Sequence, residues 1–557
     1  MRKRVVFQVV ALLCLVAGSA STGPAATRPA DVIDALIPQP RETTPTGADF
    51  VLKDGTVIAC SSRADESERF AFETFNEFLK DHGRPPLQIV DLPADADPPA
   101  GSIAIGLAPR DGFAARAILP AGAAPDTRIG DEGYQLLVSS DRGVLSANTP
   151  AGAFYAVQTL KQLTRFEGGR AVIRGVRITD WPRYRLRGFQ FDAGRSPHTI
   201  AAMKRIVRIC SHFKLNFVVF REGDDELCAV RYKTNRIGSQ NPTAVSIDDM
   251  AEFVKYASRY HVQVVPEIES LGHSSAKGFD YPDLIDDFGP KTTYPGIGIH
   301  HRKRRLILTK PEAYDLLESI YSQWVPILNT RYMHLGCDEA GGGSPEHLAR
   351  LYAILKQLGD KNAKTIQPIV WADAAETPPE LKGRYIRCLW DYGDGAGVSL
   401  DNPHLVKQGI RELVAPGCTE EAIMAGGSGS FHTPLSKTSY DKAFANLYTW
   451  SQLGNDHRNF IGLFAVQWSG NQQDLWVPDD VVCAEYGWSP DQPAYDFDRL
   501  MARVKAALAE LKDYTNPRPD EVNRSAWDGI WLDENGGWKQ DIMGKALPME
   551  PQTQKAR

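Results

Sequence analysis

Short apolar runs alternate with longer amphipathic stretches over residues 180–515. The apolar runs lie at 186–192, 217–220, 262–267, 332–336, 368–371, 385–390, 412–415 and 461–468. Helical periodicity fills several of the intervals, at 201–213, 247–260, 311–328 and 345–358. Apolar runs that alternate with helical patterns are typical of βα units around a parallel sheet. Eight such runs over about three hundred residues predict a (β/α)8 TIM barrel.

A different mixture of patterns precedes the barrel, between residues 32 and 180. Strand patterns at 88–90, 102–106 and 134–138 are interspersed with amphipathic helical patterns at 66–82 and 152–163. This mixture predicts a smaller α/β layer domain, and it contains no motif with evident chemistry. We therefore expect a non-catalytic α/β domain over 32–180, a (β/α)8 catalytic domain over 183–515 and a C-terminal tail over 516–557.

The first residues have the pattern of an export signal. Residues 1–4 are basic, residues 5–18 are apolar apart from one glutamine, and small residues follow at 18–20. This order is typical of a secretory signal peptide, and the apolar run is too short to cross a bilayer. We expect a cleavable signal peptide over 1–26 and a secreted or periplasmic protein. No later apolar run is long enough for a membrane span.

Composition excludes some classes of partner. The net charge of −6 argues against a nucleic-acid-binding protein, and the basic run at 300–305 is more simply a solvated loop. Of the eight cysteines, Cys14 leaves with the signal, and the other seven have neither disulfide-framework nor metal-site spacing. We expect no metal and no cofactor. The oligomeric state stays open.

Two adjacent carboxylates, Asp338 and Glu339, follow the fourth apolar run. A glycine loop comes next, and Ser344 and Pro345 then form a typical helix start. Active-site residues of α/β barrels lie at the carboxyl ends of the strands, where this pair is predicted to be. An isolated Asp-Glu pair is more often a solvated loop cap, so its interpretation depends on the other strand ends.

Polar residues also follow the first three predicted strands. Arg195 can bind adjacent sugar hydroxyls with its planar fork, or it can pair with Asp192 inside the protein. Asp224 and Asp225 follow the second strand. His273 follows the third, where a histidine can bridge two carboxylates and control the protonation of an acid, or be merely structural.

Tryptophans end three of the later predicted strands, at Trp371, Trp390 and Trp468. Indole faces suit the C–H faces of pyranose rings, while sugar hydroxyls are hydrogen-bonded at the edges. Three strand-end tryptophans can equally be part of an apolar core. Together with the carboxylates and Arg195, they favour a carbohydrate site.

These motifs resemble those of glycoside hydrolase family 20, the β-N-acetylhexosaminidases. The resemblance rests on His334-x-Gly336-x-Asp338-Glu339, on Pro266-Glu-Ile with Gly272-His273, on Arg187-Gly with Asp192-x-x-Arg195, and on the paired Asp224-Asp225. Ile37-Pro-Gln-Pro, Glu132-Gly-Tyr134 and the helical pattern at 152–163 resemble the non-catalytic domain that precedes family 20 barrels. The resemblance therefore covers most of the chain after the signal.

The resemblance implies a role for each candidate residue. Glu339 would be the general acid and then the base, and Asp338 would orient the substrate's own 2-acetamido group as its oxygen attacks C1. His273 and Asp224 would belong to the catalytic group, and Asp225 and Arg195 to the sugar-binding group. The three tryptophans would enclose the N-acetyl group and the apolar sugar face. The implied substrate is a glycan or glycoconjugate that ends in β-linked N-acetylglucosamine or N-acetylgalactosamine, hydrolysed with retention and without a cofactor.

The chain departs from the family pattern at three places. Val219 and Arg221 stand where the family has histidines, and no Tyr-x-Asp follows the seventh strand. The eighth strand continues as Trp468-Ser-Gly instead of Trp-x-Glu. These departures leave two alternatives open, a catalytically silent carbohydrate-binding barrel and a glycosidase for a modified amino sugar. The joint retention of the acidic pair, the arginine and the histidine favours the hydrolase.

Overall fold

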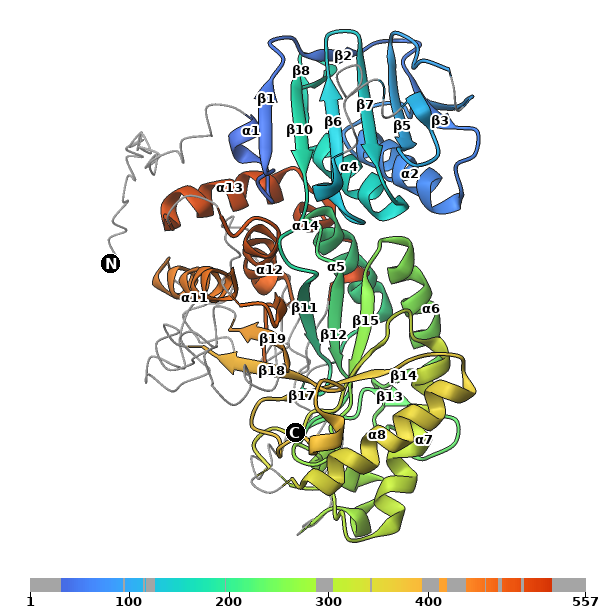
Figure 1. Ribbon diagram of the computed structural model, residues 1–557, viewed down its shortest axis with the longest axis vertical. Helices are drawn as coiled ribbons and strands as arrows, with labels where there is room; N and C mark the ends of the chain where they lie inside the picture. Colours follow the sequence, from blue (N-terminus) through green and yellow to red (C-terminus); the bar gives the residue numbers. More distant parts are fainter. Residues whose placement is uncertain are drawn as a thin grey trace, which may run out of the picture.

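The computed structural model describes residues 32–522, apart from 94–95, 114–115, 117–125, 196, 287–303, 341–342, 393–409, 418–436, 456, 469–472 and 492–494. Two domains follow one another along the chain, an α/β domain and a closed barrel (Figure 1). The expected signal peptide and residues 523–557 of the expected tail lie outside the described residues.

A seven-stranded mixed sheet forms the first domain. Its strands, in spatial order, are β1 (Glu42–Pro45), β10 (Val176–Asp180), β6 (Tyr134–Val138), β7 (Arg142–Ala147), β5 (Ser102–Leu107), β3 (Val57–Ser61) and β4 (Gln88–Leu92). The last four pair in parallel and the first three join by antiparallel pairing. A small sheet of β2 (Phe50–Leu52), β9 (Arg170–Ile173) and β8 (Thr164–Glu167) lies beside it.

Two capped helices cover this sheet, after the short helix α1 (Val32–Ala35) at the start of the domain. Helix α2 (Glu66–Asp81) begins with a capping box, in which Asp65 and Glu68 each accept the other's backbone N–H. Helix α4 (Pro150–Leu163) has Thr149 as its N-cap and a proline at its first position. The two helices pack together, and α4 lies on β5, β6 and β7.

Eight parallel strands close into a barrel in sequence order. They are β11 (Leu186–Asp192), β12 (Phe217–Arg221), β15 (Gln263–Glu267), β16 (Tyr332–His334), β17 (Gln367–Trp371), β18 (Ile386–Asp391), β19 (Arg411–Pro416) and β20 (Phe460–Phe464). The larger helices that connect or follow them are α5 (Ile200–His212), α6 (Ile247–Arg259), α7 (Pro311–Ile327), α8 (Pro345–Lys361), α11 (Lys437–Asn455), α12 (Gln473–Trp488) and α13 (Phe497–Ala509). The predicted TIM barrel, preceded by a smaller α/β domain, is confirmed.

Inward-facing side chains fill the barrel, as in a packed core. They include Phe217, Val219, Val265, Tyr332, Ile369, Trp371, Cys388, Leu413 and Phe464. Six of the eight cysteines lie in the described part of the chain. All six are buried and form no disulfide, as expected from their spacing. None of the described helices is long and apolar enough to cross a membrane.

Two strands end earlier than their apolar runs do. The fourth ends at His334, two residues before its run does, because Gly336 and Cys337 adopt φ angles of 64° and 77° and leave the extended conformation. The eighth ends at Phe464, and beyond it Val466 keeps only an isolated bridge to Gly417. Helix α12 was not expected, because it packs against β11, β20, α5 and α11 and therefore has no polar stripe.

A buried aspartate joins the two domains. Asp180, at the end of β10, accepts hydrogen bonds from Tyr134 Oη (2.6 Å), Lys214 Nζ (3.1 Å) and Trp488 Nε1 (2.8 Å). Lys214 and Trp488 belong to the barrel domain, and both Asp180 and Lys214 are at most 1% exposed. Beside them, Arg187 of β11 pairs with Glu132 at 2.9 Å. The domain interface is therefore held by buried charge pairs.

We expect Asp180→Asn to lower the free energy of unfolding by about 3–5 kcal/mol, because it leaves the Lys214 ammonium buried without its counter-charge. Urea titrations followed by tryptophan fluorescence measure the change, with the exposed Asp54→Asn as the matched control. A loss no larger than that of the control would contradict this account of the interface.

Candidate active site

The acidic, basic and aromatic residues singled out in the sequence converge at the carboxyl ends of the barrel strands. Asp192 ends β11 and Arg195 follows it, Asp224 and Asp225 follow β12, His273 follows β15, Asp338 and Glu339 follow β16, Trp371 ends β17, Trp390 lies in β18, and Trp468 follows β20. This is the end of an α/β barrel at which active sites are built. Figure 1 shows the strands that carry them.

His273 bridges two pairs of carboxylates. Its Nδ1 lies 3.1 Å from Asp224 Oδ1 and 3.2 Å from Asp225 Oδ2. Its Nε2 lies 3.1 Å from Glu339 Oε2 and 3.6 Å from Asp338 Oδ2. Burial lowers the pKa of His273, but the charge of Asp224 and the hydrogen bonds to Asp224, Asp225 and Glu339 outweigh burial and raise it well above its ordinary value. The ring is therefore an imidazolium that donates at both nitrogens.

Asp224 is the point at which three cations meet. Besides His273, it pairs with Arg195 Nη2 at 3.0 Å and with Arg221 Nη2 at 2.6 Å. Burial raises the pKa of Asp224, yet the three positive charges lower it well below the ordinary range. Asp225 is held separately, because its Oδ1 accepts from the backbone N–H and the hydroxyl of Ser275. Asp224 is therefore a carboxylate, and both aspartates contact Nδ1 of His273.

Arg195 forms internal ion pairs, which is one of the two roles that the sequence allowed. It lies 3.1 Å from Asp192 Oδ2 and 3.9 Å from Glu226 Oε2, in addition to its contact with Asp224. Its guanidinium also lies over the ring of Trp468, at 5.2 Å from the centroid. The side chain stays 22% exposed. It is thus anchored by carboxylates with one part open to the site.

Arg221 is the main residue whose importance was missed. It appeared in the sequence only as a departure from the family histidines, but it ends β12 fully buried and pairs with Asp224, Glu267 and Glu269. The sequence pattern that could have indicated its role is its position in Arg221-Glu-Gly-Asp-Asp, directly after the predicted strand at 217–220. Val219, the other departure, faces the apolar interior of the barrel. An arginine thus supplies positive charge beneath the acidic pair.

The backbone around the acidic pair is strained. Cys337, Glu339 and His273 have φ angles of 77°, 50° and 44°, which side-chain-bearing residues rarely adopt. Gly336 permits the turn, because a Cβ there would lie 2.0 Å from Glu269 Oε2. The backbone N–H of Cys337 donates to the same carboxylate at 3.2 Å. Glu269 therefore shapes the turn that aims Asp338 and Glu339.

The two members of the acidic pair differ in exposure. The Asp338 side chain is 10% exposed, whereas that of Glu339 is 36% exposed. The Glu339 carboxylate, which follows the strained turn, is therefore more open to solvent than that of Asp338. The backbone N–H of Glu339 donates to Asp373 Oδ2 at 2.6 Å. Asp373, two residues beyond Trp371, was missed in the sequence.

The tryptophans form one connected group with Tyr392. Trp371 and Trp468 meet edge to face at 5.6 Å, and Trp468 Nε1 donates to Tyr392 Oη at 2.6 Å. Trp390 contacts the Tyr392 ring at 5.5 Å. Trp390 and Trp468 are half-buried, but Trp371 has no exposed surface and donates to Glu267. The sugar-binding roles of these three remain predictions.

Two of the departures from the family pattern lie outside the described residues. They are residues 418–421, after the seventh strand where the family has Tyr-x-Asp, and Ser469-Gly470 after the eighth. Tyr392, at the end of the sixth strand, nevertheless brings a phenol group to the tryptophans from another position in the chain. The signal for it was a tyrosine two residues after Trp390.

Two groups of side chains have the spacing of metal ligands. Asp224, Asp225 and His273 form one, and His273, Asp338 and Glu339 form the other, each with ligand atoms within 4.8 Å. A metal requires a free imidazole nitrogen, whereas both nitrogens of His273 face carboxylates and carry protons. The arrangement favours ion pairing over metal ligation.

Carboxylates outnumber cations among these described residues, and protonation relieves part of the excess. Burial raises the pKa of Asp192 to about 7. Burial, followed by the charge of Asp224, raises the pKa of Glu226 to about 8. Burial and the charge of Asp338 raise the pKa of Glu269 well above the ordinary range. Negative charge is therefore concentrated on Asp224, whose pKa is lowered by the charges of Arg195, Arg221 and His273 together.

A barrel with a histidine-linked carboxylate pair beside tryptophans at its C-terminal rim defines a glycosidase-like enzyme. Family models described as "Glycosyl hydrolase family 20, domain 2" and "Glycosyl hydrolase family 20, catalytic domain" match residues 34–181 and 184–406. The chain belongs to glycoside hydrolase family 20 and is a β-N-acetylhexosaminidase-like glycosidase that removes N-acetylhexosamine from glycans. The resemblance expected from the motifs is confirmed.

Individual relatives are distant. A beta-N-acetylhexosaminidase from Cellulomonas fimi is 26% identical over 72% of this chain and 83% of that protein. A beta-hexosaminidase from Vibrio furnissii is 24% identical over 42% of each chain. The solved structure of a family 20 β-N-acetylhexosaminidase from Streptomyces coelicolor is 20% identical, with a TM-score of 0.66 over 87% of this chain and 97% of that one. The chain is a divergent member of the family.

Stability should depend on pH through Glu226. Between about pH 4.5 and 8 the folded protein keeps its proton while the unfolded chain loses it, so stability falls as pH rises through this window. Glu226→Gln stays neutral, and we expect its melting temperature to decline less between about pH 5 and 8 than that of the wild type.

Differential scanning fluorimetry across this range measures the effect, with the exposed Glu380→Gln as the control. If the melting temperatures of the wild type and Glu226→Gln changed in parallel with pH, the pKa of the Glu226 carboxyl would not be raised in the folded protein.

Proposed function

We propose that this enzyme is an exported exo-acting β-N-acetylhexosaminidase that hydrolyses terminal β-linked N-acetylglucosamine or N-acetylgalactosamine with substrate assistance and retention. The observation that carries the proposal is the His273 bridge, which connects Glu339 to the buried Asp224–Asp225 pair. The basic and apolar beginning of the chain supports export.

Glu339 would protonate the glycosidic oxygen. In the free enzyme the imidazolium 3.1 Å away favours the Glu339 carboxylate. When a sugar covers the site and excludes water, the Nε2 proton of His273 can pass to Glu339, while Asp224 and Asp225 hold the Nδ1 proton. The acid is then neutral at the moment the leaving oxygen needs a proton.

Asp338 would assist the internal nucleophile. As the glycosidic bond breaks, the acetamido oxygen of the substrate attacks C1, and positive charge develops on the acetamido group. The Asp338 carboxylate accepts the amide N–H and stabilises that charge. Glu339, now a carboxylate, then takes a proton from the water that opens the cyclic intermediate at C1. Two displacements at C1 retain the β configuration.

The substitution Glu339→Gln removes the proton that the general acid would transfer. We expect turnover of a disaccharide with a poor leaving group to fall by about 10²–10⁴-fold, and that of an activated aryl glycoside to fall less. Steady-state kinetics on both substrates measure the difference, with Glu380→Gln as control. Near-normal turnover of the disaccharide would reject Glu339 as the acid, and an enzyme inactive before mutation would favour a silent binding barrel.

The substitution Asp338→Asn keeps the shape of the side chain but removes its charge. The charge is needed only as the acetamido group becomes positive, so the loss should appear in kcat with KM nearly unchanged. A thiazoline analogue of the cyclic intermediate should inhibit the wild type more strongly than the variant. A variant with raised KM and unchanged kcat, or an active wild type insensitive to the analogue, would argue against substrate assistance.

A further inference from the structure

A rim of arginines surrounds the end of the barrel opposite to the active site. In a parallel barrel the strand starts meet at one end, and the catalytic residues lie at the other. Arg185 directly precedes β11, Arg331 directly precedes β16, and Arg411 is the first residue of β19. Arg384 and Arg458 each lie two residues before a strand, β18 and β20. We call these five residues the basic rim.

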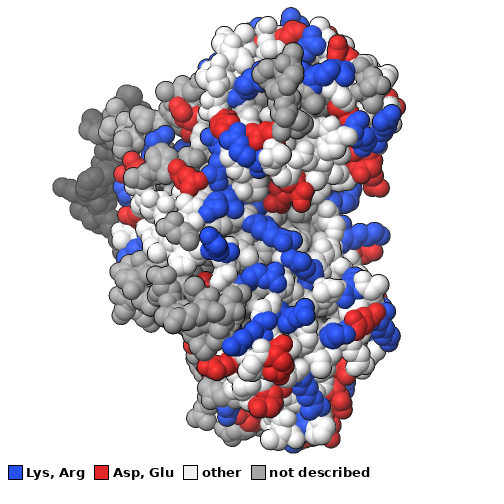
Figure 2. All heavy atoms as spheres, viewed as in Figure 1, with Lys and Arg blue, Asp and Glu red and all other residues white. Residues whose placement is uncertain are grey.

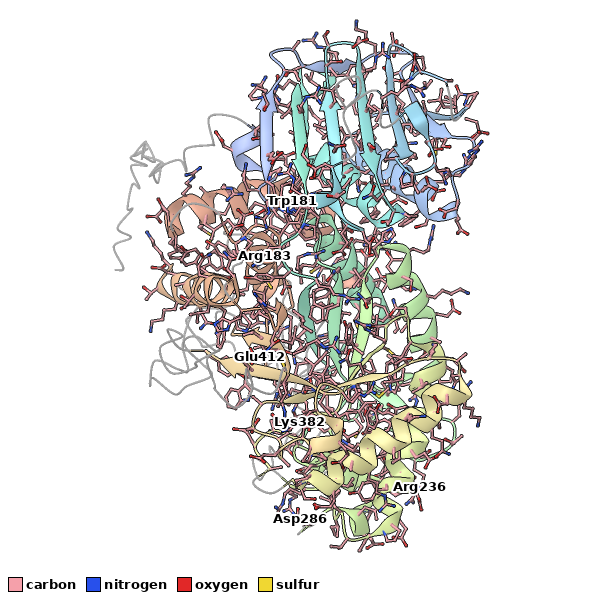
Figure 3. All side chains as sticks on the ribbon, in the orientation of Figure 1. Trp181, Arg183, Arg236, Asp286, Lys382 and Glu412 are labelled. Carbon is pink, nitrogen blue, oxygen red and sulfur yellow. The ribbon has the colours of Figure 1, made fainter. Side chains whose placement is uncertain are left out.

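Other basic side chains add to the positive charge of this part of the molecule. Figure 2 shows Lys and Arg side chains gathered across the middle of one face, with few acidic side chains among them. Figure 3, in the same orientation, labels Arg183 and Lys382 at two ends of this region. Arg183 lies three residues before β11, and Lys382 lies four residues before β18. Arg183 and Lys382 thus lie close in sequence to the starts of β11 and β18.

The rim arginines have no carboxylate partners within the described part of the chain. Among the described residues, no carboxylate lies within 4.0 Å of a side-chain nitrogen of the five rim arginines, which are Arg185, Arg331, Arg384, Arg411 and Arg458. Arg331 instead lies over the ring of Tyr332, at 5.2 Å from its centroid. Glu412, which follows Arg411 in the chain, is fully buried. The positive charge of the rim is thus presented to solvent.

Three of these charges repel one another. Burial lowers the pKa of Arg411, and the neighbouring guanidinium charges of Arg331 and Arg185 lower it further. Such repulsion opposes folding and is relieved when an anion binds between the cations. The whole chain has a net charge of −6, so the rim is a local concentration and not a reflection of overall composition.

We propose that the basic rim binds an anionic polysaccharide, a chain with repeated carboxylate or sulfate groups. Guanidinium groups match both anions through paired N–H donors. Positive charges distributed over the starts of five strands suit a linear polymer with repeated anionic groups. Binding to a membrane surface typically adds apolar anchors, whereas Leu186 and Tyr332, the apolar residues beside the rim, are buried. The site is independent of catalysis and would hold the enzyme on a polymer while its active site stays open.

Binding of fluorescent dextran sulfate, with neutral dextran for comparison, tests the proposal over a range of salt concentrations. The rim variant carries Arg185→Gln, Arg331→Gln, Arg384→Gln and Arg458→Gln. The control makes the same charge change at exposed residues elsewhere, Lys53→Gln, Arg170→Gln, Lys255→Gln and Lys442→Gln. Melting temperature and aryl-glycoside hydrolysis verify folding, and should the quadruple variant fail this check, the Arg185/Arg384 double variant takes its place.

We expect the wild type to bind dextran sulfate and not dextran, more weakly as salt rises. At about 50 mM salt the rim variant should bind about tenfold more weakly or worse, and the control within about twofold of the wild type. Hydrolysis should be unchanged in both. If the rim variant and the control lost the same affinity for dextran sulfate, binding would depend only on the net charge of the protein, and the proposal would be overturned. Wild-type binding to phosphatidylserine vesicles but not to dextran sulfate would overturn it in favour of a membrane.

Discussion

The charge on His273 is the constraint from which the rest of the active site follows. A histidine with carboxylates 3.1 Å from each ring nitrogen stays protonated despite burial. Buried carboxylates are costly unless they are paired, and the pairing here is shared between His273, Arg195 and Arg221. Glu339 is thereby connected through one proton-bearing ring to a carboxylate pair that water does not reach.

Arg221 shows how a divergent member of a family keeps such a balance with different residues. It lies between Asp224 on one side and Glu267 and Glu269 on the other, beneath the turn that carries Asp338. Glu269 in turn occupies the space that only a glycine at position 336 leaves free. The strained φ angles of Cys337 and Glu339 therefore depend on ion pairs made two strands away. Electrostatics and backbone geometry are coupled at this site.

The two ends of the barrel have opposite electrostatic character. The carboxylates of the active site lie where the strands end, and the arginines of the basic rim lie where the strands begin. The first domain is fixed to the barrel through Asp180 and Lys214, close to the start of β12. The proposed polymer attachment would therefore use the end of the barrel opposite to the catalytic residues. A polyanion repelled by the carboxylates of the active site can still approach the opposite end.

The sequence by itself determined the barrel, because eight apolar runs separated by helical patterns have few other ways to bury their faces. It also indicated the strand-end residues, from Arg195 to Trp468, because parallel strands bring their ends to one rim. Only the tertiary structure decided that Arg221, Asp373 and Tyr392 join them, since their roles depend on partners between 3 and 76 positions away. The same holds for the exposure of Glu339, which follows from a local turn that apolar periodicity does not encode. Helix α12 went unpredicted for the converse reason, because burial on all sides removes the pattern from which helices are recognised.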